Sequence, residues 1–405
     1  MCFETPLRLR SAAPQHERFW YSGAGWPPHL CHLRAPWAGA TGSDTMRGDK
    51  RVFLTLDGLR GIAAIMIVLF HSPALVGHLR PQSAYLSVDL FFALSGCVLE
   101  ASYRDRLAAG LSTREFMLIR CIRLWPMFAL SLLVGMAFAL IRLEHGIGGE
   151  TAWGIATALF TGLALLPTPA MTGKGWVVPL NAAGWSLILE LAINFLYALF
   201  WRHLTNRLLS IIVAVAGITL MVMSTRHGGI DMGSTWGSIA GGLVRVTYSF
   251  ALGVLILRAY DGRVWTGWMS AIPPLMLIPI LAMNRGGLWF DLVAALVLLP
   301  MIVWAGLRLE PGPWLGRVFR WGGLVSYALY ALHGPVLKFV RMEVVLHVEH
   351  SRIAFMTAGL IAIAALLPIC ALLDRWVDAP LRRRLSAALL RPRDRRIAEP
   401  AMSLP

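Results

Sequence analysis

A series of long apolar segments is the feature that most constrains the fold of this chain. Each segment runs for close to 20 residues with few charged side chains. About 20 residues of helix span the hydrocarbon core of a bilayer. The segments predict membrane-spanning helices over residues 61–78, 84–102, 122–141, 184–201, 208–224, 237–257, 265–283, 289–306, 321–340 and 353–373.

The composition agrees with this pattern. Hydrophobic residues make up 57% of the 405 residues, and only 15% are charged, against about 25% in a soluble domain. We therefore expect an all-α fold, a polytopic membrane helix bundle of about ten transmembrane helices. An additional apolar segment, 152–166, is shorter and precedes a stretch rich in Pro and Gly, so it is either an eleventh span or a re-entrant piece.

The basic residues indicate how the chain is oriented. If segment 152–166 does not cross and the N-terminus is cytosolic, 27 of the 37 Lys and Arg residues lie in cytosolic segments and 7 in outer segments. Cytosolic loops of membrane proteins carry such an excess, so we expect both termini to be cytosolic. This topology accounts for the net charge of +15. No nucleic-acid-binding signature is present, and a nucleic-acid partner is not expected.

Three regions are predicted along the chain. Residues 1–45 contain scattered Trp, Pro, His and Arg without helical periodicity and lack the apolar core of a signal peptide. Translation starting at Met46 would make them a mis-called extension; the alternative is a disordered cytosolic tail. Residues 46–380 are expected to form the integral membrane domain, and 381–405 a basic cytosolic tail. No soluble domain is expected after the last span.

One helix face of the first span carries three ionisable residues. Arg60 and His71 are eleven residues apart, which is three helical turns plus about 20° and an axial distance of about 16 Å. Asp57 shares that face. A stripe thus runs from a cation at the cytosolic surface to an imidazole near mid-bilayer. An ionisable residue at membrane depth is a candidate functional residue; the alternative is a histidine packed between helices with one hydrogen bond.

Other polar residues at membrane depth come from the middle of the chain. Asp89 lies in the outer half of its span, Glu190 lies inside another, and Arg245 lies too deep for its side chain to reach the interface easily. Arg120 and Arg123 share a face at the cytosolic entrance of span 122–141. This arginine pair suits phosphate, although residues of this kind also serve as positive-inside anchors.

The segment SYALYALHGPV adds a further polar face. Tyr327, Tyr330 and His333 are spaced by three residues and so lie along one side of a helix. They could instead pack the bundle through hydrogen bonds. Together with the ionisable residues above, they predict a polar cavity inside the bundle.

The residues favour acid/base transfer chemistry. Burial disfavours a charged imidazolium, so we expect a neutral His71 that can accept a proton. The cytosolic arginines could hold a phosphorylated donor. The five cysteines form no CxxC pair, and GxSxG, HExxH, Walker A and dinucleotide motifs are missing. We expect neither a metal nor a bound cofactor.

Six motifs follow one another in an order typical of a known family. They are LDGLRGIAAIMIVLFH, SVDLFFALSG, RCIRLWP, GWSLILE, Arg245 with Phe250 and Gly253, and SYALYALHGPV. The chain thereby resembles the family-3 membrane acyltransferases over about residues 53–375. One departure is Cys121 between the arginines of RxxR, where the family often has another basic residue; this could weaken donor binding slightly.

The resemblance implies a function. The family transfers an acyl group, commonly acetyl, from cytosolic acyl-CoA as co-substrate to a hydroxyl of an extracytoplasmic glycan or glycolipid. A multi-pass protein of the bacterial inner membrane is implied. His71 would activate the acceptor or receive the acyl group, and Glu190 is the second expected catalytic residue. The expected substrate-binding residues are Asp57, Arg60, Asp89, Arg120, Arg123, Arg245, Tyr327, Tyr330 and His333.

A transporter or flippase is the alternative from another class of protein. It would also need buried charges and a polar cavity. No repeated halves are detectable in the sequence, which argues weakly against it. The lipid bilayer is a partner under either hypothesis, and nothing in the pattern indicates an oligomeric state.

Overall fold

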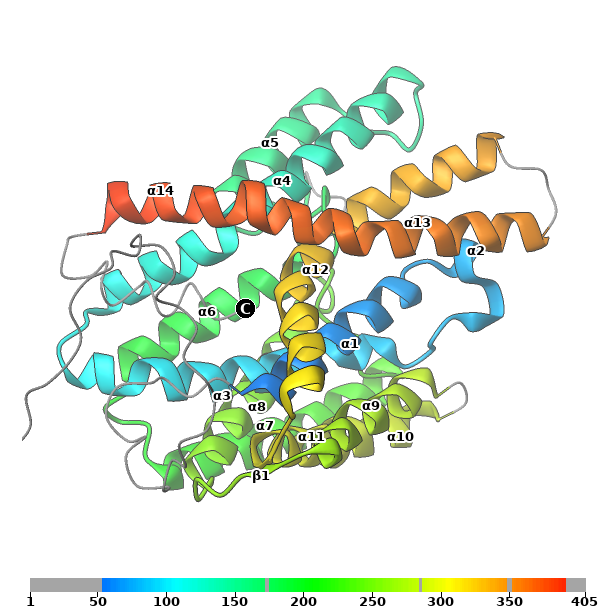
Figure 1. Ribbon diagram of the computed structural model, residues 1–405. Coiled ribbons are helices and arrows are strands. Elements are labelled where there is room, and N and C mark those ends of the chain that lie inside the picture. Colours follow the sequence, from blue (N-terminus) through cyan, green and yellow to red (C-terminus); the bar gives the residue numbers. More distant parts are fainter. Residues whose placement is uncertain (1–52, 172–174, 284–285, 348–351, 391–405) are drawn as a thin grey trace, which may run out of the picture. The chain divides into compact units, whose positions relative to one another are not determined.

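The computed structural model describes residues 53–171, 175–283, 286–347 and 352–390 (Figure 1). The expectations for residues 1–45 lie outside these described residues. Within them the fold is an all-α bundle, as predicted. A short parallel pairing joins β1 (Trp265–Thr266) to β2 (Leu309–Glu310).

The helices follow the order of the predicted spans. Their bounds are α1 Leu54–Phe70, α2 Pro73–Val76, α3 Ser87–Ala108, α4 Thr113–Glu144, α5 Ala152–Leu163, α6 Gly184–Phe200, α7 Asn206–His227, α8 Ile239–Arg258, α9 Ile272–Ala282, α10 Gly287–Val293, α11 Leu299–Arg308, α12 Pro313–His347, α13 Arg352–Leu373 and α14 Ala379–Leu389. π-helical turns join α10 to α11 and α13 to α14, over Ala294–Leu298 and Asp374–Asp378.

Many of these helices could cross a membrane. In the described part of the chain, six helices are long and apolar enough, or seven if the bent pair of α1 with the segment from Pro73 to Leu79 is one span. Three shorter apolar helices are Ala152–Leu163, Gly184–Phe200 and Trp268–Ala282. Every predicted span overlaps a helix, and segment 152–166 contains α5. The number of crossings and the side of each terminus stay predictions.

The helices at the first predicted span, 61–78, begin earlier and contain a bend. Helix α1 begins at Leu54 and ends at Phe70, and the chain then bends by 88°. Pro73 explains the end, because the residue before a proline disfavours helical geometry. Arg60 consequently lies inside α1 rather than at the beginning of a span. His71 lies at the bend, just beyond the last helical residue.

The helix that contains the third predicted span, 122–141, begins before residue 122. Helix α4 begins at Thr113, where Ser112 and Glu115 form a capping box: the Ser112 hydroxyl accepts from the Glu115 backbone N–H, and the Glu115 carboxylate accepts from that of Ser112. Such a box satisfies backbone donors at a helix N-terminus. Arg120 and Arg123 therefore lie two to three turns inside α4, not at its entrance, and Pro126 is an interior residue.

Glycine contacts bring pairs of helices close together. A Cβ on Gly61 of α1 would lie 2.8 Å from the Cα of Gly322 in α12. On α3, a Cβ on Gly96 would lie 2.2 Å from the Phe250 carbonyl oxygen of α8. Small residues permit such crossings in membrane bundles. They hold α1 against α12 and α3 against α8.

Outer helices present apolar side chains to their surroundings. On α7, Ile211, Val215 and Ile218 are each 58–59% exposed, and on α13 Ile353 and Ile361 are 78% and 64% exposed. Soluble proteins rarely expose such continuous apolar patches. These surfaces are typical of helices that face lipid.

We predict that Gly61→Val destabilises the protein, because the new side chain would overlap the Gly322 backbone. Overpacking of this kind costs about 1–3 kcal/mol. The thermal midpoint of the detergent-solubilised protein, followed by fluorescence-detected size exclusion, should fall. Gly237→Val is the control, since a Cβ there meets nothing within 4 Å. Equal midpoints for the two variants would contradict the tight crossing.

Candidate functional site

Two histidines from opposite ends of the sequence meet at the bend after α1. The Nε2 atom of His333, on α12, lies 3.3 Å from the Nδ1 atom of His71, although the residues are 262 positions apart. His333 is fully buried, whereas His71 is exposed. His333 is thus the buried ring of the pair, and His71 is its exposed ring.

Backbone carbonyl groups assign the protons on these rings. His333 Nδ1 lies 2.7 Å from the Tyr330 carbonyl oxygen, and His71 Nδ1 lies 3.0 Å from that of Ile67. A carbonyl oxygen only accepts, so in the neutral rings both Nδ1 atoms carry the hydrogen. The single Nδ1 hydrogen of His71 is then shared between the Ile67 carbonyl oxygen and His333 Nε2, which accepts it at the longer distance. The lone pair of His71 Nε2 is left to act as a base.

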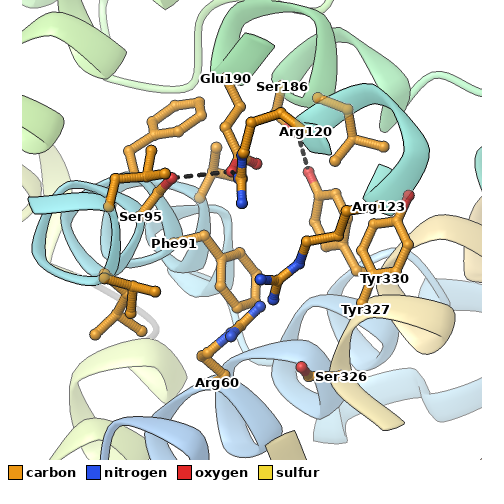
Figure 2. A pocket seen from close by; sticks show the side chains of 16 residues that line it. Arg60, Phe91, Ser95, Arg120, Arg123, Ser186, Glu190, Ser326, Tyr327 and Tyr330 are labelled. Atoms are coloured by element: carbon orange, nitrogen blue, oxygen red, sulfur yellow. Dashed lines mark hydrogen bonds and ion pairs between the residues drawn. The ribbon is translucent and has the colours of Figure 1, made fainter. Parts of the chain in front are cut away.

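A cavity lined by arginines lies on the other side of Tyr330. It has a volume of about 80 Å³. Figure 2 shows Arg60 of α1 and Arg123 of α4 entering it, with Arg120 and Glu190 at the opposite wall. The structure thus brings together four residues that were predicted to contribute to a functional site.

Glu190 neutralises only part of this positive charge. Its Oε1 atom accepts from Arg120 Nη2 at 2.8 Å and from the Ser95 hydroxyl at 2.9 Å. The lining contains three arginines and one carboxylate, an excess of two positive charges. Guanidinium groups match phosphate and carboxylate geometry, so the cavity suits an anionic ligand.

Tyr330 separates the cavity from the histidine pair. Its ring lies at centroid distances of 5.3 Å from Phe91 and 5.7 Å from His333. Its hydroxyl is 2.6 Å from that of Ser186 (Figure 2). Tyr327 also lines the cavity, and its hydroxyl donates to the Leu124 carbonyl. A rotation of Tyr330 would connect the arginine side to the histidine side.

The remaining predicted residues lie outside the cavity lining. Asp89 and Arg245 are 2% and 0% exposed, and they bind each other through Nε–Oδ1 at 3.1 Å and Nη2–Oδ2 at 2.7 Å. Asp57 is buried against Gly323 of α12, where an added Cβ would come within 2.7 Å of its side chain. The Asp89–Arg245 pair thus joins α3 to α8, and Asp57 packs against α12. The substrate-binding role of all three residues stays a prediction.

Two polar residues of the site were missed in the sequence. Ser186 contacts Tyr330, and the buried Asn181 donates its amide to the Ser131 hydroxyl at 2.9 Å and the Ala331 carbonyl at 2.8 Å. Ser186 stands within the GWSLILE motif, and Asn181 just precedes it. A polar side chain at the beginning of an apolar helix was the available signal.

A family model described as an acyltransferase domain, of the acyltransferase-3 type, matches residues 53–375. The chain belongs to this family. "Protein 2 in picA locus" of Rhizobium radiobacter is 37% identical over 183 residues, which make up 42% of this chain and 93% of that protein. No solved structure matches significantly. The protein is therefore an integral membrane acyltransferase, and the predicted family is confirmed.

The buried ion pair of this acyltransferase gives a test of its structural role. We predict that Arg245→Met lowers the thermal midpoint strongly, because Asp89 would remain as a buried, unpaired charge. Removing one partner of such a pair costs about 3–5 kcal/mol.

The double variant Asp89→Leu/Arg245→Met should recover much of this loss, since no isolated charge remains. The midpoints of both variants would be compared in the same detergent. A double variant as unstable as Arg245→Met would contradict the assignment.

Proposed function

We propose that this acyltransferase transfers an acetyl group from cytosolic acetyl-CoA to a hydroxyl of an extracytoplasmic glycan or glycolipid, in the bacterial inner membrane. One observation carries the proposal: the histidine pair, with His71 exposed, and the positively charged cavity lie on opposite sides of Tyr330. The charge bias of the loops assigns the arginine side to the cytosol and the histidine side to the exterior. Acetyl is the acyl group that the resemblance implies.

The arginine cavity would hold the phosphates of the donor. At about 80 Å³ it is smaller than the roughly 300–1,000 Å³ of small-molecule sites, so the adenosine of the donor would remain outside. Along α1, Arg60 and His71 are separated by about 16 Å. The extended pantetheine arm of the donor would cover this distance past Tyr330 and deliver the thioester to His71.

The transfer step follows from the assigned protons. His71 Nε2 takes the proton of the acceptor hydroxyl as its oxygen attacks the thioester carbonyl carbon. The new C–O bond replaces the C–S bond, the CoA thiolate leaves, and it receives the proton from the imidazolium. His333 accepts the Nδ1 hydrogen bond and fixes the orientation of His71. Glu190 would act at the donor, where it holds Arg120.

We predict that His71→Ala loses acetyl transfer, because the variant lacks the Nε2 lone pair that acts as the proposed base. Removing a general base costs about 10²–10⁴-fold in rate. The measurement is label transfer from labelled acetyl-CoA to a glycan acceptor by the purified protein.

His78→Ala is the matched control, since His78 is exposed and near in sequence. It should retain wild-type transfer. Full transfer by His71→Ala would contradict the proposal. Movement of substrate across vesicles without label transfer would instead favour a transporter.

The donor site makes a separate prediction about KM. Arg120→Gln and Arg123→Gln should each raise the KM for acetyl-CoA about 10–100-fold, since a hydrogen bond to a charged group contributes about 1.5–3 kcal/mol. Arg114→Gln is the control, because Arg114 lies exposed in the first turn of the same helix. An unchanged KM in both cavity variants would contradict a donor site there.

A further inference from the structure

A second and larger cavity lies near the C-terminal end of α4. Its volume is about 370 Å³, within the roughly 300–1,000 Å³ of small-molecule sites. Its walls come from α4, from α5, from the segment Trp176–Ala182 and from α12. None of the predicted site residues lines it.

Cations outnumber anions on the walls of this cavity. Arg142 and Lys338 are both lining residues, and Glu150 is the carboxylate among them. Glu150 lies 3.6 Å from Arg142 Nε, which leaves one net positive charge. Lys338 Nζ lies 5.9 Å from the centre of the Phe138 ring. The balance favours a ligand that carries one negative charge.

The backbone holds Arg142 in position. Gly148 has a left-handed φ of +75°, and a Cβ there would lie 1.7 Å from Arg142 Nη2. Glycine alone adopts this conformation without a steric cost and leaves the space open. The chain between α4 and α5 therefore closes around the guanidinium and orients it.

Trp176 supplies an aromatic surface beside these charges. Its side chain is 43% exposed and lines the cavity. Its backbone forms an antiparallel bridge with Thr235, and the Val177 N–H donates to the Ser234 carbonyl at 3.0 Å. An aromatic ring presents a flat apolar face, which matches the C–H face of a sugar ring. Because the backbone of Trp176 is held in place before a ligand binds, ordering this residue on binding costs little entropy.

This second cavity shares helix α12 with the buried histidine, His333. Lys338 follows His333 by five residues on α12, an axial distance of about 7.5 Å. Between the lining residues Leu180 and Ala182, Asn181 donates to the Ala331 carbonyl on the same helix. Along the axis of α12, Lys338 therefore lies one to two helical turns from His333, and Asn181 contacts the same helix two residues before His333.

We propose that this cavity binds a sugar residue carrying a carboxylate, as part of the acceptor glycan. Arg142 and Lys338 would bind the carboxylate, and Trp176 would stack on the sugar ring. The inference rests on the proposed function, in which the histidine side receives the acceptor. It adds the chemical class of that acceptor: an acidic glycan rather than a neutral one.

The test measures binding without any acyl donor. Disaccharides containing glucuronate or galacturonate, and their carboxyl-reduced counterparts, would be titrated into the purified full-length protein and followed by saturation-transfer NMR. A uronate disaccharide should bind at least ten-fold more tightly than its reduced form. Arg142→Gln, Lys338→Gln and Trp176→Ala should each weaken uronate binding about ten-fold or more.

Matched controls lie elsewhere on the chain. Arg226→Gln changes an exposed arginine outside the cavity, and Trp289→Ala removes a tryptophan that is 72% exposed; both should bind like wild type. Lys338→Arg keeps the charge and should restore most of the binding. Thermal midpoints of all variants would separate unfolding from loss of affinity.

The outcomes separate this inference from the proposed function. Equal binding of the acidic and reduced sugars, no binding of either uronate by the wild-type protein, or wild-type binding by all three cavity variants would overturn the cavity assignment. Acetyl transfer that survives His71→Ala would overturn the function and leave a measured binding site in place. Intact acetyl transfer without uronate binding would overturn only the inference.

Discussion

Arg245 has no exposed surface, and its guanidinium is held by Asp89 together with the carbonyl groups of Tyr85 and Met232. A charge at membrane depth is costly unless it is paired within the protein. The pair therefore fixes α8 against α3, reinforcing the glycine contact at Gly96. Helix α3 supplies Phe91 and Ser95 to the arginine cavity, so the wall of the site depends on this ion pair.

The two halves of the proposed chemistry, donor binding and acyl transfer, lie on opposite sides of Tyr330. The arginines share one cavity, where Glu190 offsets part of their charge, and the histidines lie beyond Tyr330. Because α1 carries Arg60 and ends beside His71, and α12 carries both Tyr330 and His333, two helices span the distance between the sides. Their close crossing at Gly61 and Gly322 sets how these residues face one another.

Local patterns predicted much of this arrangement. The apolar segments marked the helices, and the eleven-residue spacing placed Arg60 and His71 along one face. The differences between the apolar segments and the helix bounds are also local in origin. Pro73 ends α1 before the apolar run ends, and the capping box at Ser112 starts α4 before its run begins. Hydropathy reports how apolar a segment is and how long it runs, whereas the residues at which a helix begins and ends depend on backbone hydrogen bonds.

The sequence by itself determined an all-α membrane bundle, the acyltransferase family and the set of ionisable residues at membrane depth. Tertiary structure decided how those residues pair: Asp89 with Arg245 across 156 positions, and His71 with His333 across 262. It also decided that Asp89 and Arg245 are both buried, whereas the histidine pair keeps one exposed ring, that of His71. Periodicity reports which face of a helix is buried; the partner on that face depends on how closely the helices cross.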